Sequence, residues 1–127
     1  MMGNRKVVEF EHKRIIDINL AEDMGARVVI SGGDEHSGVF FSRLRIEHDG
    51  KEIWINSEED IVQKKAPSIS GAMILGAEAL ENGDLLMRLS NEATLFFPHS
   101  DDIESWELRW LNGKQIISLP GGGFAEF

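Results

Sequence analysis

The chain has 127 residues, of which 42% are hydrophobic, and it carries a net charge of −9 from 22 acidic and 13 basic side chains. This length and composition exclude a disordered chain and predict one globular domain with a single core over residues 1–127. Cysteine is absent, so disulfides and thiolate metal sites are excluded, and the acidic balance opposes binding to nucleic-acid phosphates.

No apolar run approaches the length of a signal-peptide core or of a membrane span, so we expect a cytoplasmic protein without membrane contact. An acidic protein attracts partners with a basic surface, and salt lowers the rate of their association. The alternative is that the charge only keeps a small domain soluble.

In chain order, the sequence consists of short β-strand patterns separated by polar breaks, which predicts an all-β protein with at most one or two short helices. Leu20–Gly25 is expected to be a loop or a single helical turn, and Gly32–Gly38 a flexible loop. Ser57-Glu58-Glu59-Asp60 is typical of a helix start, and Pro67 closes that segment. The predicted strands are Lys6–Glu11, Arg14–Asn19, Arg27–Ser31, Val39–His48, Lys51–Ile55, Ala77–Glu81, Asp84–Ser90, Ala93–Phe97, Trp106–Trp110 and Ile116–Leu119.

Three dipeptides predict tight hairpins between these strands: Asp49-Gly50, Asn82-Gly83 and Asn112-Gly113. Such pairs adopt the positive φ angles that a two-residue hairpin turn requires. Trp106, Leu108 and Trp110 alternate with polar residues and should share one buried face of their strand.

We expect these strands to form an antiparallel β-sandwich or a closed barrel of about 8–9 strands, since either arrangement removes most exposed edges. The strand Asp84–Ser90 is apolar on nearly every residue, so it is expected to be covered on both faces or to lie at an interface.

The two halves of the chain resemble each other. Asn112-Gly113-Lys114 lies 63 residues after Asp49-Gly50-Lys51, and Ser105 lies at the same offset from Ser42. This spacing predicts a duplicated unit, with residues 14–56 repeated as 74–119. The alternative is a chance likeness, because all hairpins share the same turn chemistry.

Two histidines lie near carboxylates. His36 follows Asp34-Glu35, and His99 precedes Asp101-Asp102. Imidazole with carboxylate oxygens is a donor set that divalent metals accept, but no second histidine stands at ligand spacing. A surface pairing of histidine and aspartate explains the pattern better, so we predict no metal and no cofactor.

No catalytic set is recognisable. The chain has neither cysteine nor tyrosine, and no serine lies in a G-x-S-x-G turn. Pro120-Gly121-Gly122-Gly123 follows a strand, but it lacks the lysine and the helix of a phosphate-binding loop. These glycines are predicted to let the backbone bend sharply or approach a neighbour closely. We therefore expect that the protein is not an enzyme.

The C-terminal half carries a recognisable series of motifs. Asn82-Gly83-Asp84-Leu85 opens a strand, Ser105-Trp106-Glu107-Leu108 follows an acidic loop, and Pro120-Gly121-Gly122-Gly123 precedes the end. Over residues 74–127 the chain thereby resembles an uncharacterised family of small bacterial all-β proteins. Short acidic domains of this type also resemble immunity proteins, which neutralise bacterial toxins by covering basic surfaces. The resemblance implies protein binding and supplies no catalytic residue.

The leading hypothesis is a non-catalytic protein-binding domain, most concretely an immunity-type inhibitor of a toxin with a basic surface. A second hypothesis is a small-ligand-binding or metal-assisted site in a barrel mouth, anchored by His36 or His99. A third is a structural homodimer formed through the apolar strand Asp84–Ser90. The candidate partner-binding residues are Glu58, Glu59, Asp60, Asp101, Asp102 and Glu104.

Overall fold

The computed structural model describes residues 6–7, 13–21, 25–32, 35–56, 60, 69, 71–110 and 113–127. These residues form two antiparallel six-stranded sheets, which we name sheet A and sheet B. Sheet A has the strand order β1-β7-β8-β9-β5-β6, and sheet B has the order β12-β11-β10-β4-β3-β2. The strands are β1 (Lys6–Val7), β2 (Arg14–Ala21), β3 (Gly25–Gly32), β4 (Glu35–Phe41), β5 (Leu44–His48), β6 (Lys51–Ile55), β7 (Ile74–Ala79), β8 (Leu85–Leu89), β9 (Thr94–Phe97), β10 (Trp106–Arg109), β11 (Gln115–Ser118) and β12 (Phe124–Glu126).

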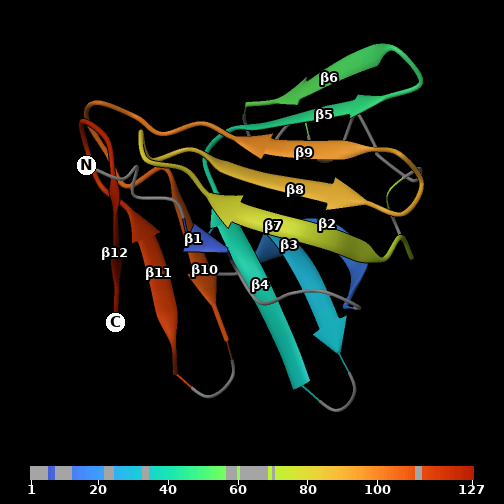
Figure 1. Ribbon diagram of the computed structural model, residues 1–127, viewed down its shortest axis with the longest axis horizontal. Helices are drawn as coiled ribbons and strands as arrows, with labels where there is room; N and C mark the ends of the chain where they lie inside the picture. Colours follow the sequence, from blue (N-terminus) through green and yellow to red (C-terminus); the bar gives the residue numbers. More distant parts are fainter. Residues whose placement is uncertain are drawn as a thin grey trace.

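The two sheets pack as a sandwich, and their strands cross steeply (Figure 1). Backbone hydrogen bonds near one edge join the start of β2 to the start of β7, from Ile15 N–H to the Ala72 carbonyl at 2.9 Å and from Ile74 N–H to the Lys13 carbonyl at 2.7 Å. These bonds link the sheets without closing them into a barrel. The predicted all-β antiparallel sandwich is confirmed, and the barrel alternative is not.

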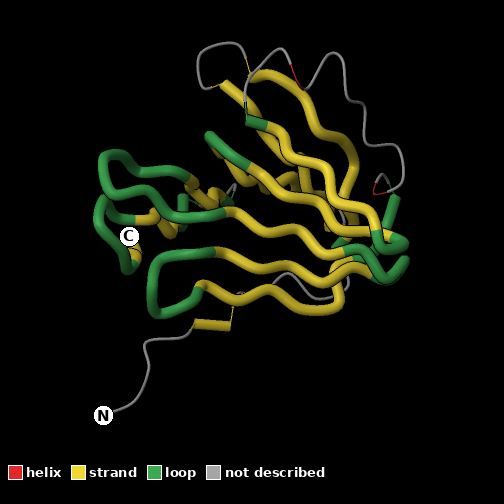
Figure 2. Tube along the Cα trace, turned by 90° about the horizontal axis from the view of Figure 1, so that it is seen from above, coloured by secondary structure: helices red, strands yellow, loops and turns green. Residues whose placement is uncertain are grey.

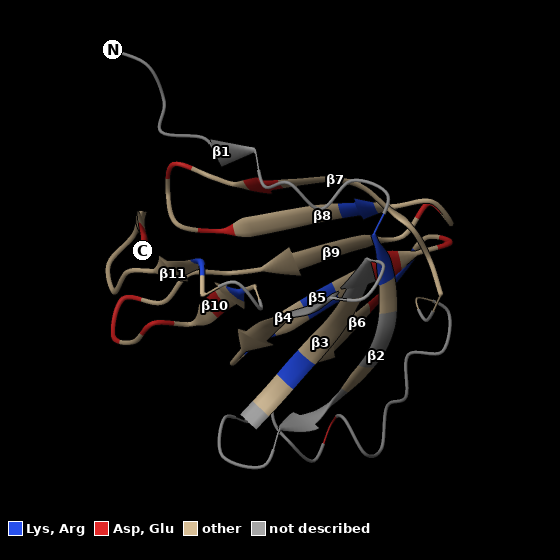
Figure 3. Cartoon of the chain, turned by 90° about the horizontal axis from the view of Figure 1, so that it is seen from below, with Lys and Arg blue, Asp and Glu red and all other residues tan. Residues whose placement is uncertain are grey.

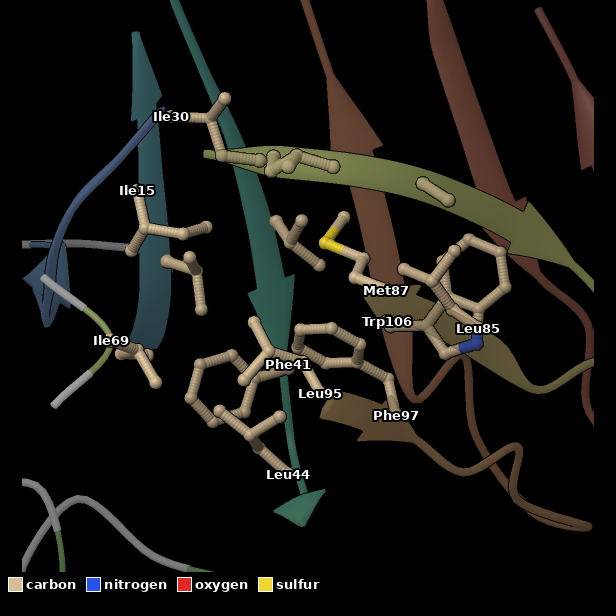
Figure 4. Packing of buried hydrophobic residues seen from close by; sticks show 14 of the residues in the cluster. Ile15, Ile30, Phe41, Leu44, Ile69, Leu85, Met87, Leu95, Phe97 and Trp106 are labelled. Carbon is tan, nitrogen blue, oxygen red and sulfur yellow. The ribbon is translucent and has the colours of Figure 1, made fainter. Parts of the chain in front are cut away.

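The core lies between the sheets and is built from alternate residues of each strand (Figure 4). On β10, Trp106 and Leu108 are buried while Trp110 packs against the edge of the core, so the predicted shared face is confirmed. Near the centre, Phe41 of β4 meets Phe97 of β9 edge to face, with ring centroids 5.7 Å apart. This geometry is the favoured one for two aromatic quadrupoles, and it joins one sheet to the other.

The strand β8 does not need a second protein to cover its outer face. Leu85, Met87 and Leu89 point into the core. Leu86 on the other face is half-buried and stands opposite Phe96 in the register of β8 with β9. Neighbouring side chains of sheet A therefore shield much of the apolar surface on which the homodimer hypothesis rested.

Both halves of the chain have the same strand plan. In the first half, β2-β3-β4 form a meander in sheet B, and the hairpin β5-β6 then enters sheet A. In the second half, β7-β8-β9 form a meander in sheet A, and the hairpin β10-β11 enters sheet B. The two crossings lie side by side, since Ser42 N–H donates to the Ser105 carbonyl at 2.8 Å. An internal duplication would produce this plan, and the duplication itself stays a prediction.

Several predicted boundaries are wrong. Gly32–Gly38 was expected to be a flexible loop, but β3 continues to Gly32 and β4 begins at Glu35. The predicted strand Val39–His48 is two strands, because the chain changes sheets at Ser42. The Leu20–Gly25 loop is shorter than expected, because β2 reaches Ala21 and β3 starts at Gly25.

The described residues form more strands than the expected eight or nine, in part because the predicted strand Val39–His48 is divided at Ser42 and the C-terminal strand β12 was not predicted. The hairpins across Asp49-Gly50 and Asn82-Gly83 are confirmed by the pairing of β5 with β6 and of β7 with β8. The pairing of β10 with β11 confirms the third hairpin. Apart from Asp60, the predicted helix start at Ser57 lies outside the described residues.

The Phe41–Phe97 contact gives a test of the core. Replacing Phe97 with alanine should lower the free energy of unfolding by about 3–5 kcal/mol, because it opens a cavity between the sheets. Phe96→Ala is the matched control, since Phe96 precedes it on the same strand and points to the outer face. Urea denaturation followed by tryptophan fluorescence measures both values, and equal losses would contradict this assignment of the core.

Candidate functional site

Three segments far apart in the sequence meet at one end of the molecule. They are the β7–β8 turn (residues 80–84), the β9–β10 loop (residues 98–105) and the β11–β12 turn (residues 119–123). Gly121 N–H donates to the Ser100 carbonyl at 2.8 Å, and His99 N–H donates to an Asp84 carboxylate oxygen at 2.8 Å. We name this region the acidic end; Figure 2 shows loops gathered at the end of the molecule where the chain terminates.

Trp106 fixes the turns of the acidic end against the core. Its side chain is buried, and its indole N–H donates to the Gly83 carbonyl at 2.8 Å. Gly83 has φ +98°, and a Cβ there would lie 2.8 Å from the Gly123 nitrogen and 2.9 Å from the Gly123 oxygen. Gly122 is similarly close to the Asn82 carbonyl. The predicted role of the Pro120–Gly123 glycines, a sharp bend with close backbone approach, is what the geometry shows.

Asp84 holds the turn and the loop together. Its side chain is largely buried and accepts hydrogen bonds from Asn82 Nδ2 at 2.9 Å and from His99 N–H at 2.8 Å. The His99 ring nitrogen Nδ1 lies 2.7 Å from the same carboxylate oxygen. His99 thus pairs with Asp84 rather than with Asp101-Asp102, which follow it in the sequence. These bonds give the pair a structural role in shaping the acidic end.

The β9–β10 loop is closed at its base and exposed at its tip. The Ser105 hydroxyl donates to the Pro98 carbonyl at 2.6 Å, and the Ser105 carbonyl accepts the Ser42 N–H. The Ser100 hydroxyl accepts Asp102 N–H at 3.1 Å. A loop whose two ends meet is compact and displays its tip in a defined position.

The tip of this loop is acidic with one apolar side chain at its centre. Asp101, Asp102 and Glu104 are exposed, and Ile103 between them is 50% exposed. Figure 3 colours the acidic positions of the chain red, including those along this loop. The sequence therefore placed three of its six candidate residues, Asp101, Asp102 and Glu104, on one loop. Glu58 and Glu59 lie outside the described residues, and Asp60 accepts the Asn56 N–H at 2.9 Å at the end of β6.

Sequence reasoning missed two contributors to this end. Glu81 is exposed on the turn that packs against the loop, and only the fold brings it there. The other is Ile103, and its signal in the sequence is a lone apolar residue inside an acidic run. The three segments contain the acids Glu81, Asp84, Asp101, Asp102 and Glu104 and no lysine or arginine.

The other features of the described residues offer less chemistry. A shallow depression of about 340 Å³ between the β5–β6 and β8–β9 turns is lined partly by Glu47, Asp49 and Glu92, and its histidine, His48, has Nε2 3.1 Å from the Asn91 carbonyl oxygen. Across the described ranges, no group of three or more histidine, aspartate or glutamate residues is arranged to hold a metal ion. The side chain of His36 lies outside what the structure describes. No helix in that same portion of the chain is long and apolar enough to cross a membrane.

Comparison with known proteins places the chain in a family. Residues 8–127, which include every described strand except β1 and the whole acidic end, match the model of DUF6188, a family of unknown function. The chain belongs to this family. No curated protein and no solved structure matches the chain. The DUF6188 match covers the first half of the chain as well as residues 74–127, in which the motifs were noted.

Gly83 offers a test of the close approach at the acidic end. Gly83→Ala should lower the free energy of unfolding more than Gly113→Ala, because both glycines have positive φ but a Cβ at Gly113 meets nothing within 4 Å. The φ strain alone should cost Gly113→Ala about 1–2 kcal/mol. Thermal and urea unfolding of both variants measure the difference, and equal destabilisation would argue against the contact with Gly123.

Asp84 offers a second test. Asp84→Asn should destabilise the fold by about 1–3 kcal/mol, because an amide weakens charge-assisted bonds and turns a donor toward Asn82 or His99. Asp101→Asn, at an exposed position on the neighbouring loop, is the control and should change stability by less than about 0.5 kcal/mol. Similar unfolding midpoints for the two variants would remove Asp84 as the organiser of this end.

Proposed function

We propose that this protein is a non-catalytic protein-binding domain, most concretely an immunity-type inhibitor that binds a toxin with a basic surface through the acidic end. The observation that carries the proposal is the composition of that end. Three segments from the second half of the chain converge there with exposed carboxylates on Glu81, Asp101, Asp102 and Glu104, and they bring no lysine or arginine.

Electrostatics favours a basic partner at this surface. A group of like charges at one end of a domain of net charge −9 creates a field that accelerates the approach of a cationic protein. The same charges repel acidic proteins and nucleic acids, so the field contributes to selectivity as well as to rate.

Ile103 adds an apolar contact to the charged surface of the loop. A partly exposed isoleucine ringed by carboxylates is the arrangement of a small apolar anchor with a polar rim. The loop is tied at its base by Ser100 and Ser105, so less conformational entropy is lost when a partner binds. A rigid acidic projection of this kind can cover a basic active surface and thereby inhibit the enzyme that carries it.

The proposal predicts how loop variants behave. The full-length protein should retain a basic protein from its native cells, and the purified partner should bind more weakly as salt rises, because salt screens the charges. Asp101→Asn with Asp102→Asn should lower the association rate and flatten the salt dependence. Ile103→Ala should weaken binding about tenfold, as loss of an apolar anchor does. Calorimetry and stopped-flow kinetics measure these changes.

Asp49→Asn is the control for the loop variants. Asp49 is an exposed acid at the far end of β5, and asparagine tolerates its positive φ of 53°. This variant should bind as the native protein does. The inhibitor role is tested by co-expression, in which the native chain protects cells from the recovered partner and the loop variants do not. A partner that binds all variants equally would overturn the proposed site.

A further inference from the structure

A second charged cluster lies on the outer face of sheet A, near the β4–β5 crossing. Two guanidinium groups stand over the ring of Trp54, Arg43 at 4.9 Å and Arg45 at 5.7 Å from the ring centroid. Arg45 also stands over the Phe96 ring at 4.6 Å. We name Arg43, Arg45, Trp54 and Phe96 the arginine–aromatic cluster. Contact with the rings holds the two guanidinium groups close together; Arg45 is half-buried and Arg43 is exposed.

The charges of the two arginines are only partly matched inside the molecule. Arg43 donates from Nε to the neutral side-chain oxygen of Asn56 at 3.2 Å. Arg45 forms an ion pair with Glu47, with 3.5 Å between Nε and Oε1, and this buried Nε makes no hydrogen bond among the described residues. The nearby Glu52 accepts a hydrogen bond from the indole N–H of Trp54 at 2.6 Å, so its carboxylate is directed to the Trp54 ring. The terminal nitrogens of two guanidinium groups oriented in this way are suited to carboxylates.

The chain itself displays the complementary group. The tip of the β9–β10 loop offers Asp101, Asp102 and Glu104 around the exposed Ile103, and its carboxylates match the two arginines while the isoleucine matches the rings. Within the described residues, no hydrogen bond or ion pair joins these loop carboxylates to Arg43 or Arg45. A second copy of the chain can therefore provide the contact that the single molecule does not make.

The two surfaces are placed for a reciprocal contact. The last residue of the loop, Ser105, accepts hydrogen bonds from the N–H and the hydroxyl of Ser42, which directly precedes Arg43. Loop and cluster are thus adjacent patches of one molecule. If a two-fold axis relates two molecules at these patches, the loop of each copy reaches the cluster of the other. The same contact is then made twice, which gives a closed dimer instead of an open chain of molecules.

We propose that this protein forms a two-fold homodimer in which the acidic loop of each copy, Asp101–Glu104, docks on the arginine–aromatic cluster of the other. The contact is short-ranged, because the net charge of −9 on each copy opposes association at a distance. A basic partner competes for the same loop, so the inhibitor would exchange its own second copy for its target. The proposal of the dimer does not depend on which protein the inhibitor binds.

Sedimentation velocity of the full chain at micromolar concentrations tests the dimer. The native protein should show a concentration-dependent mass rising towards twice that of one chain. Arg43→Glu with Arg45→Glu, and separately Asp101→Lys with Asp102→Lys, should each weaken dimerisation about tenfold or more, since charge-assisted hydrogen bonds are lost. An equimolar mixture of these two double variants should recover the dimer, because both contacts then pair opposite charges again.

Arg88→Glu is the matched control. Arg88 is an exposed arginine of the same sheet, lies over Gly76 rather than an aromatic ring, and should leave the dimer unchanged. The milder variants Arg45→Gln and Ile103→Ala serve if a double variant fails to fold, as judged by circular dichroism. A native protein that stays monomeric, variants that dimerise normally, or a mixture that does not recover would each overturn the dimer, and none of these results would affect capture of a basic partner.

Discussion

The indole N–H of Trp106 must find an acceptor inside the protein, and the Gly83 carbonyl supplies it at 2.8 Å. A buried donor left without a partner costs about 1–3 kcal/mol, so this bond dictates where the β7–β8 turn of sheet A meets sheet B. Once Gly83 is placed, the Gly123 backbone can approach it because Gly83 carries no Cβ, which would lie 2.8 Å from the Gly123 nitrogen. The β11–β12 turn then positions Ser100, whose carbonyl accepts Gly121 N–H, and with it the start of the acidic loop.

A second organising feature is the paired crossing between sheets. At each crossing, a Phe-Phe pair ends the strand: Phe40-Phe41 before Ser42, and Phe96-Phe97 before Pro98. The second phenylalanines meet in the core, while each first one lies outside beneath an arginine of the adjoining hairpin strand, Arg109 on β10 or Arg45 on β5. The same local solution is thus used on both sheets, as expected if one unit was duplicated.

The two halves differ where function is proposed. The crossing in the first half takes only Ser42 and Arg43, whereas that in the second half carries the loop of residues 98–105. The shared plan needs no long connection at this point, because two residues suffice to turn the chain from one sheet to the other. The extra length is therefore free to carry exposed charge and Ile103, while its base adds hydrogen bonds that hold the neighbouring turns. Rigidity at the base and exposure at the tip come from the same insertion.

The sequence by itself determined the β class, the hairpins and the buried face of the tryptophan strand, because alternation and Asn-Gly or Asp-Gly turns act over a few residues. It also located the acidic loop as a run of carboxylates. It did not reveal the change of sheet at Ser42, because the strand pattern runs from Val39 to His48 without a break. Only the tertiary structure decided that His99 pairs with Asp84, that Glu81 joins the acidic end, and that Arg45 stacks on Phe96. These contacts link residues on different strands, and their partners are fixed by register and by packing between the two sheets, which no local pattern encodes.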